Sequence, residues 1–172
     1  DSHAHLDDER FDEDRENLIQ SIKEDGVTKL ISAGYSLEGS KRAVELAKKY
    51  DFIYATCGIS PNDVPQSEEE LWNVLKEIKD IVKQNSKVVA IGEIGLDYYW
   101  NKENKEIQQK GFTEQIKLAN ELELPIVIHT RDAVMDTIEI LKQNEAKYKG
   151  VFHCCPLNRE LVKEALKLGF YI

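Results

Sequence analysis

The sequence has few cysteines, with only Cys57, Cys154 and Cys155 among 172 residues. An odd number that includes one adjacent pair does not suit the disulfide framework of a small secreted domain, but it does suit a reduced compartment. No apolar run is long enough for a membrane span, and no signal peptide is recognisable. The sequence therefore predicts a globular, cytoplasmic protein with no membrane partner.

Positive charge is also scarce, because 23 lysines and arginines face 32 aspartates and glutamates, a net charge of −9. This balance argues against a basic clamp that grips nucleic acid independently of sequence. It does not exclude an enzyme that acts on phosphates, since bound divalent cations supply local positive charge. No linker or low-complexity segment divides the chain, so we expect one domain over residues 1–172.

Short runs rich in Val, Ile and Tyr alternate with longer, charged, amphipathic segments, which predicts strands alternating with helices. Such an alternation is typical of a parallel sheet with right-handed crossovers, either an open doubly wound sheet or a (β/α)8 TIM-type barrel. The expected strands are an opening strand that ends at His3–His5, then Lys29–Gly34, Phe52–Ile59, Val88–Asp97, Pro125–Arg131, Val151–Cys155 and the start of another at Phe170–Ile172. The expected helices are Asp12–Glu24, Leu37–Tyr50, one opened by a Ser67–Glu70 capping box, Lys105–Glu121, Ala133–Asn144 and one capped by Asn158.

All four histidines lie near the carboxyl ends of predicted strands. Glu93 lies near the end of another predicted strand and is the fifth candidate metal ligand. Residues i and i+2 of a strand share a face, so His3 and His5 should project together. Both architectures collect function at the carboxyl ends of strands, but a closed barrel brings the strands of His3, Glu93, His129 and His153 around one mouth. The ligand pattern therefore favours the barrel. Such a barrel typically needs about 250 residues, so we expect this chain to hold about six βα units and the start of a seventh strand, with the C-terminal part missing.

Four imidazoles and a carboxylate exceed the three protein ligands that one catalytic zinc usually takes. They suit two divalent metal ions about 3.5–4 Å apart, bridged by Glu93 and by a hydroxide that attacks phosphorus. The ligand types admit zinc, manganese, iron or magnesium. Arg131 should share the face of His129, where its guanidinium could bind a phosphate. The alternative is a salt bridge to Asp132 or to another acid at a strand end.

Three further positions have two interpretations each. Asp97 either holds a metal ligand in place or begins a loop. Cys155 either binds a soft metal or packs as a small hydrophobic residue. The run Tyr98–Trp100 either stacks nucleobases at the mouth or packs beneath a loop.

Four stretches resemble the TatD family of metal-dependent deoxyribonucleases, a branch of the amidohydrolase-like barrels, in their order and spacing: 1–7 (DSHAHLD), 92–99 (GEIGLDYY), 125–133 (PIVIHTRDA) and 150–154 (GVFHC). The resemblance implies a (β/α)8 barrel that hydrolyses phosphodiester bonds of DNA exonucleolytically, without reading sequence. It implies that His3, His5 and Glu93 hold one metal ion, and that Glu93, His129 and His153 hold the other. The family's last ligand is an aspartate at the end of an eighth strand, which is not in this sequence.

The sequence departs from the family pattern in two places. Ser60 stands where the family often has a histidine, and Cys155–Asn158 replace the usual Phe-Ser-Gly-Ser. Both departures leave the expected metal ligands in place and bear on substrate contacts. Two other functions stay open: a small-molecule amidohydrolase or lactonase with the same metal pair, and a binding protein without catalysis. The sequence does not determine the oligomeric state.

Overall fold

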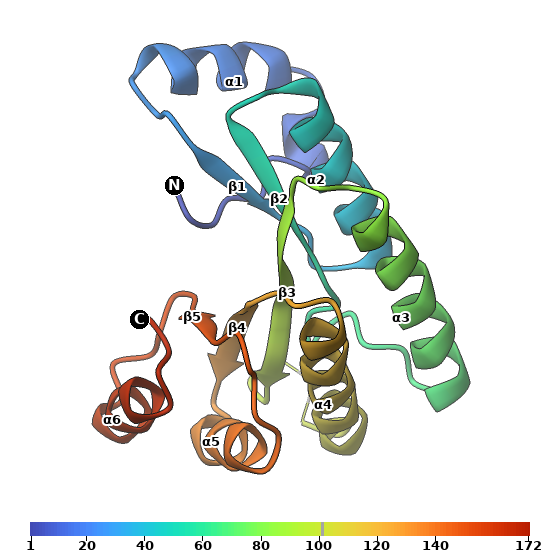
Figure 1. Cartoon of the computed structure of the whole chain (residues 1–172), viewed down its shortest axis with the longest axis vertical. Helices are drawn as coiled ribbons and strands as arrows, with labels where there is room; N and C mark the ends of the chain where they lie inside the picture. Colours follow the sequence, from blue (N-terminus) through green and yellow to red (C-terminus); the bar gives the residue numbers. More distant parts are fainter. Residues whose placement is uncertain (101) are drawn as a thin grey trace.

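The computed structural model describes residues 1–100 and 102–172, and its centre is a curved parallel sheet (Figure 1). All strand pairs run parallel, and the strands follow one another across the sheet in chain order. Within the described residues the strands are β1 (Leu30–Ala33), β2 (Ile53–Cys57), β3 (Val88–Asp97), β4 (Ile126–Arg131) and β5 (Gly150–Phe152).

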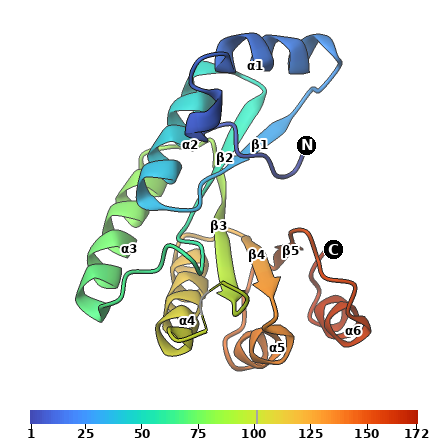
Figure 2. The ribbon, with the colours of Figure 1, turned by 180° about the vertical axis from the view of Figure 1, so that it is seen from behind.

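Helices α2 to α6 follow one another around the outer side of the sheet, as the two opposite views show (Figures 1 and 2). Side-chain caps begin three of them, since Ser36, Ser67 and Asn158 accept hydrogen bonds from backbone amides three residues later. The helical segments are η1 (Glu9–Phe11), α1 (Arg15–Glu24), α2 (Leu37–Lys49), α3 (Glu68–Lys83), α4 (Lys105–Glu121), α5 (Val134–Gln143) and α6 (Arg159–Lys167).

The sequential strand order rules out the doubly wound alternative, in which the strand order reverses within the sheet. Two isolated parallel bridges extend the same order at both edges: Ala4 pairs with Ser32 beside β1, and Tyr171 pairs with Val151 beside β5. The chain thus follows a (β/α)8 barrel through six βα units to a seventh strand position, as predicted.

The predicted strand ending in His3–His5 is wrong in extent, because pairing there is limited to the bridge at Ala4. The predicted strand Val151–Cys155 also ends early. The chain leaves the sheet after Phe152, and Cys154 adopts a positive φ of 44° that no regular strand allows. His153 therefore lies just beyond the end of β5.

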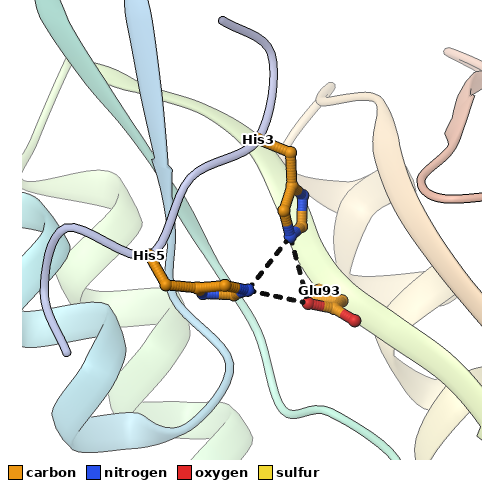
Figure 3. Close-up of side chains that lie close together, drawn as sticks. All are labelled: His3, His5 and Glu93. Carbon is orange, nitrogen blue, oxygen red and sulfur yellow. Dashed lines mark hydrogen bonds and ion pairs between the residues drawn. The ribbon is translucent and has the colours of Figure 1, made fainter. Parts of the chain in front are cut away.

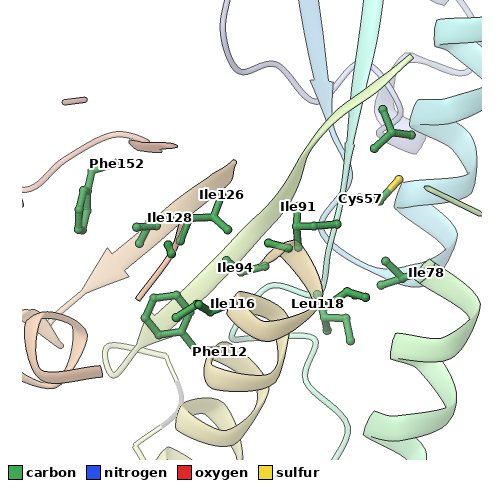
Figure 4. Packing of buried hydrophobic residues seen from close by; sticks show 14 of the residues in the cluster. Cys57, Ile78, Ile91, Ile94, Phe112, Ile116, Leu118, Ile126, Ile128 and Phe152 are labelled. Atoms are coloured by element: carbon green, nitrogen blue, oxygen red, sulfur yellow. The ribbon is translucent and has the colours of Figure 1, made fainter. Parts of the chain in front are cut away.

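An apolar core fixes the sheet against its outer helices (Figure 4). Ile91, Ile94 and Ile128 from the strands are fully buried, as are Phe112 and Ile116 of α4. Burying a side chain of this size stabilises the fold by about 1.5–3 kcal/mol. This packing makes β3 and β4 rigid supports for the polar residues at their ends.

Among the described residues, no helix combines the length and the apolar composition needed to cross a bilayer.

Candidate metal centre

The two N-terminal histidines lie on an extended segment, residues 1–5, which we call the N-terminal arm. Its backbone is held to β1 because the Ala4 amide donates to the Ile31 carbonyl at 3.0 Å and the Ala33 amide donates to the Ala4 carbonyl at 2.8 Å. His5 Nδ1 lies 2.9 Å from the Ala33 carbonyl oxygen. A carbonyl can only accept, so Nδ1 carries the proton, and Nε2 of a neutral His5 keeps its lone pair. His3 and His5 project to one side, as the i, i+2 spacing predicted.

Both imidazoles converge on one carboxylate oxygen (Figure 3). His3 Nε2 lies 3.2 Å from His5 Nε2 and 3.2 Å from Glu93 Oε2, and His5 Nε2 lies 3.6 Å from the same oxygen. Metal–nitrogen distances of about 2.0–2.1 Å place neighbouring ligands of a tetrahedral ion about 3.3 Å apart. The triangle of ligand atoms therefore has the size that a first-row divalent ion requires.

Two glycines place Glu93 in the interior of the sheet. A Cβ at Gly92 would come within 2.6 Å of Val127 Cβ, and one at Gly95, whose φ is +137°, within 2.0 Å of the His129 carbonyl oxygen. Only glycine allows β3 to approach β4 this closely. The β3–β4 register shifts between Ile91 and Ile94, and the Glu93 amide donates instead to the Gly34 carbonyl at 2.9 Å.

Glu93 is only 7% exposed, as its flanking glycines and apolar neighbours predicted. Burial by itself raises the pKa of the carboxyl group. Hydrogen bonds and charge interactions with His129 and His3 outweigh burial and bring the pKa well below its usual value. Glu93 is thus an ionised, buried carboxylate that needs positive partners.

The second carboxylate oxygen of Glu93 faces another histidine. His129 Nδ1 lies 2.9 Å from Glu93 Oε1, and His129 Nε2 lies 3.0 Å from Asp97 Oδ2. Burial lowers the pKa of His129, but the two carboxylates outweigh burial and raise it. His129 Nδ1 and Glu93 Oε1 thus face each other across a gap in which a divalent cation could take both as ligands.

His153 completes this second group. Its ring stacks on His3 with centroids 3.5 Å apart and planes 10° from parallel. Burial, reinforced by the charge of His3, lowers the pKa of His153 to about 4. It is therefore neutral at pH 7 and offers a lone pair to a metal. The ligand atoms of His3, His5 and Glu93, and those of Glu93, His129 and His153, lie within 4.8 Å of one another in each group.

Asp97 touches His129 directly, which agrees with the interpretation that it holds a ligand in place. Its side chain is 1% exposed. Its Oδ1 accepts from the amides of Tyr99 at 3.0 Å and Trp100 at 3.2 Å, and its Oδ2 also accepts from Asn62 Nδ2 at 3.3 Å. Burial raises the pKa of Asp97, but these hydrogen bonds outweigh it and lower the pKa. Because Asp97 engages Nε2, His129 presents Nδ1 to Glu93.

Arg131 is exposed, and its guanidinium lies over Tyr99, 3.9 Å from the ring centroid. In the described part of the chain this contact takes the place of the salt bridge to Asp132 that was the alternative. Cys155 belongs to neither metal-ligand group among the described residues; its Sγ lies 3.6 Å from the Pro156 carbonyl oxygen.

Sequence reasoning missed three residues near the centre. Asn62 donates to Asp97, Asp63 accepts from Ser60 Oγ at 2.6 Å, and Tyr35 packs edge-on against His5. Burial chiefly, and the charge of Glu93 less, raises the pKa of Asp63. All three follow the end of β1 or β2, so the strand-end position that identified the histidines was a signal for them as well.

Comparison with known proteins gives this arrangement a family. The family model described as TatD related DNase matches residues 1–172. The chain is 42% identical over 173 residues to the uncharacterized metal-dependent hydrolase YabD of Bacillus subtilis, covering all of this chain and 66% of YabD. It is 34% identical over 164 residues to the 3'-5' ssDNA/RNA exonuclease TatD of Cronobacter sakazakii, covering 95% of this chain and 61% of that protein.

A solved structure agrees with these sequences. The crystal structure of YJJV, a TatD homologue from Escherichia coli K12, superposes with a TM-score of 0.89 at 30% identity, covering 99% of this chain and 65% of that one. The chain thus spans just under two thirds of the length of these relatives. The match of the family model over every residue, with a matching fold, shows that the chain belongs to the TatD related DNase family.

Proposed function

We propose that this centre holds two divalent metal ions and hydrolyses phosphodiester bonds of DNA, removing nucleotides from a strand end. The observation that carries the proposal is that Glu93 divides its two oxygens between two histidine groups. Oε2 faces His3 and His5, whereas Oε1 faces His129. One carboxylate placed in this way can bridge two ions.

In this proposal His3, His5 and Glu93 hold one ion, and Glu93, His129 and His153 hold the other. When bound, two such ions polarise a phosphodiester, provide a nucleophile at neutral pH and neutralise the charge that develops on phosphorus oxygens. The residues themselves fix this arrangement. Asp97 orients the ring of His129, and the Ala33 carbonyl orients the ring of His5 when the arm lies along β1.

Arg131 is proposed to bind the phosphate of the substrate. It lies two residues after His129 on the same face of β4. A guanidinium that rests on an aromatic ring keeps its in-plane N–H groups free for a bidentate contact with phosphate. In a chain of net charge −9, this side chain and the ions would provide the positive charge that a polyanion needs.

The substrate class receives support from a relative. The protein from Cronobacter sakazakii is named a 3'-5' ssDNA/RNA exonuclease.

The experiment follows hydrolysis of a 5'-labelled single-stranded DNA by the protein that carries this chain, loaded with Mn²⁺ or Zn²⁺ or stripped by chelation. We expect single-nucleotide shortening that depends on metal and returns when metal is restored. Hydrolysis that survives thorough metal removal would contradict the metal mechanism. Lactones and cyclic amides provide the test of substrate class, since turnover of these without turnover of DNA would identify a small-molecule hydrolase.

A further inference from the structure

Two large aromatic side chains project into solvent beside the candidate metal centre. Tyr99 is 48% exposed and Trp100 is 69% exposed. Their rings meet edge to face, with centroids 4.7 Å apart, and the Arg131 guanidinium lies 3.9 Å from the Tyr99 centroid and 5.5 Å from that of Trp100. We call Tyr99, Trp100 and Arg131 the aromatic platform.

Packing among the described residues does not account for this exposure, and the preceding residue shows the difference. Tyr98 is 5% exposed, and its hydroxyl donates to Asp136 Oδ2 at 2.7 Å while accepting from Gln109. It performs the packing role that an aromatic run beneath a loop usually has. The next two residues turn away from the core, at a cost that a bound ligand would recover by covering them.

The platform is tied to the centre through one carboxylate. Asp97 accepts from His129 through Oδ2 and from the amides of Tyr99 and Trp100 through Oδ1. Arg131 follows His129 by two residues on β4, a separation of about 6.5 Å along a strand. A substrate whose phosphate lies between the ligand groups would thus place its neighbouring unit over the platform.

We propose that the aromatic platform stacks a nucleobase adjacent to the scissile phosphate, with Trp100 as the main stacking surface. This inference rests on the proposed nuclease function and specifies how the strand is held. Every nucleobase has a flat π face, so stacking binds single strands without reading their sequence, and a nearby arginine adds a cation–π contribution. In this proposal Tyr99, whose ring centroid lies 3.9 Å from the Arg131 guanidinium, holds that guanidinium beside the phosphate.

The test compares kcat/KM of Trp100→Ala on a thymidine oligonucleotide and on an oligomer of abasic deoxyribose phosphates. Only the first can stack. We expect the ratio of the two kcat/KM values to fall about 10-fold or more, chiefly through KM for the thymidine strand. Trp100→Phe, which keeps an aromatic face, should recover most of the ratio. A ratio that Trp100→Ala leaves unchanged would overturn the platform.

Trp72 offers a matched control, because it is 47% exposed and lies on the outer surface between α3 and α4. Trp72→Ala should leave the ratio as it is. An equal fall in both tryptophan variants would overturn the assignment to Trp100.

A binding measurement separates this inference from the proposed hydrolysis. Residues 1–172 contain two tryptophans, so in a Trp72→Phe background the signal of Trp100 is the difference from the Trp72→Phe/Trp100→Phe double variant. The fluorescence of Trp100 should be quenched by a hydrolysis-resistant phosphorothioate thymidine strand and not by the abasic oligomer. Quenching without turnover of any DNA would support the platform while contradicting the nuclease. Turnover of DNA without quenching would support the nuclease and contradict the platform.

Discussion

The two sides of the candidate metal centre are built differently. The N-terminal arm, which carries His3 and His5, is joined to β1 by one isolated bridge at Ala4. Glu93 and His129 lie on β3 and β4, which pair over several residues above a buried core. The same site is therefore supported on one side by a segment that pairs through a single bridge and a few further hydrogen bonds at Asp1, and on the other side by two strands that pair over several residues.

The two sides differ in strand pairing and not in burial. The side chains of His3 and Glu93 are both 9% exposed, and those of His5 and His129 are 34% and 22% exposed. A segment that pairs through a single bridge opens locally at a lower free energy than a core strand paired along its length. We infer that β3 and β4 form their half of the site without metal, and that the arm depends on metal for much of its order.

Removing the residue that joins both sides should have the largest effect. Glu93→Gln keeps the size of the side chain but removes the charge that both ligand groups share, and hydrolysis should fall more than about 100-fold, beyond what loss of an outer partner of a ligand costs. Steady-state hydrolysis of single-stranded DNA measures the change. Glu164→Gln is the control, because Glu164 lies on α6 and pairs with Lys142 of α5, and this variant should keep near-normal activity. If Glu93→Gln does the same, Glu93 is not the bridge.

Disturbing only the rigid side should have the next largest effect. Asp97→Asn removes the charge that fixes Nε2 of His129, and activity or metal affinity should fall about 10- to 100-fold, the usual result of losing such a partner. Metal titrations measure the change in metal affinity, and kcat at saturating metal measures the change in activity. An unchanged metal affinity and rate would show that His129 does not need Asp97 to present Nδ1.

Adding metal should change the two sides unequally. The amides of Ala4 and Ala33 form the bridge between the arm and β1, and their hydrogen exchange should slow about tenfold when free metal is ten times its Kd. Amides in the β3–β4 ladder, such as those of Ile94 and Ile128, should change little. Hydrogen exchange with residue resolution gives both values. Equal slowing of hydrogen exchange in the arm and in the β3–β4 ladder would contradict the inference that the arm alone depends on metal for its order.

The smallest effect is expected from Glu164, a carboxylate remote from both sides of the site. Its substitution should change the free energy of unfolding and not the activity. Hydrogen bonds from Lys142 and Lys167 lower the pKa of Glu164 to about 2. Because the pKa of Glu164 is lower in the folded protein than in the unfolded chain, its ionised carboxylate stabilises the fold at pH values above the unfolded pKa. This stabilisation is lost as the pH falls from about 4.5 to about 2. The wild type should exceed Glu164→Gln in free energy of unfolding at pH 7, and the gap should narrow over that range. Denaturant unfolding at several pH values measures it.

Much of the fold was predictable from local pattern. Helix Lys105–Glu121 and strand Val88–Asp97 have the predicted bounds, because amphipathic spacing and apolar runs report directly on burial. The arm was predicted as a strand because its composition and its His-x-His spacing suit one. Pairing there depends on how far the arm runs beside β1, which is a tertiary property.

The candidate site was predictable in its ligands and less so in its surroundings. Every histidine lay at a predicted strand end, and parallel strands bring those ends together, so the sequence alone was enough to group His3, Glu93 and His129. The contact of Asn62 with Asp97 could not be derived in this way, since loop conformation decides it. The stacking of Arg131 on Tyr99, in place of pairing with Asp132, depends on the same loop.

The central claim is that Glu93 joins two metal sites, and metal stoichiometry tests it most directly. The protein that carries this chain is stripped, dialysed to equilibrium against Zn²⁺ or Mn²⁺, and analysed by mass spectrometry for bound metal per chain. We predict two equivalents for the wild type and at most one for Glu93→Gln. One equivalent or none in the wild type, or two in both proteins, would contradict the account.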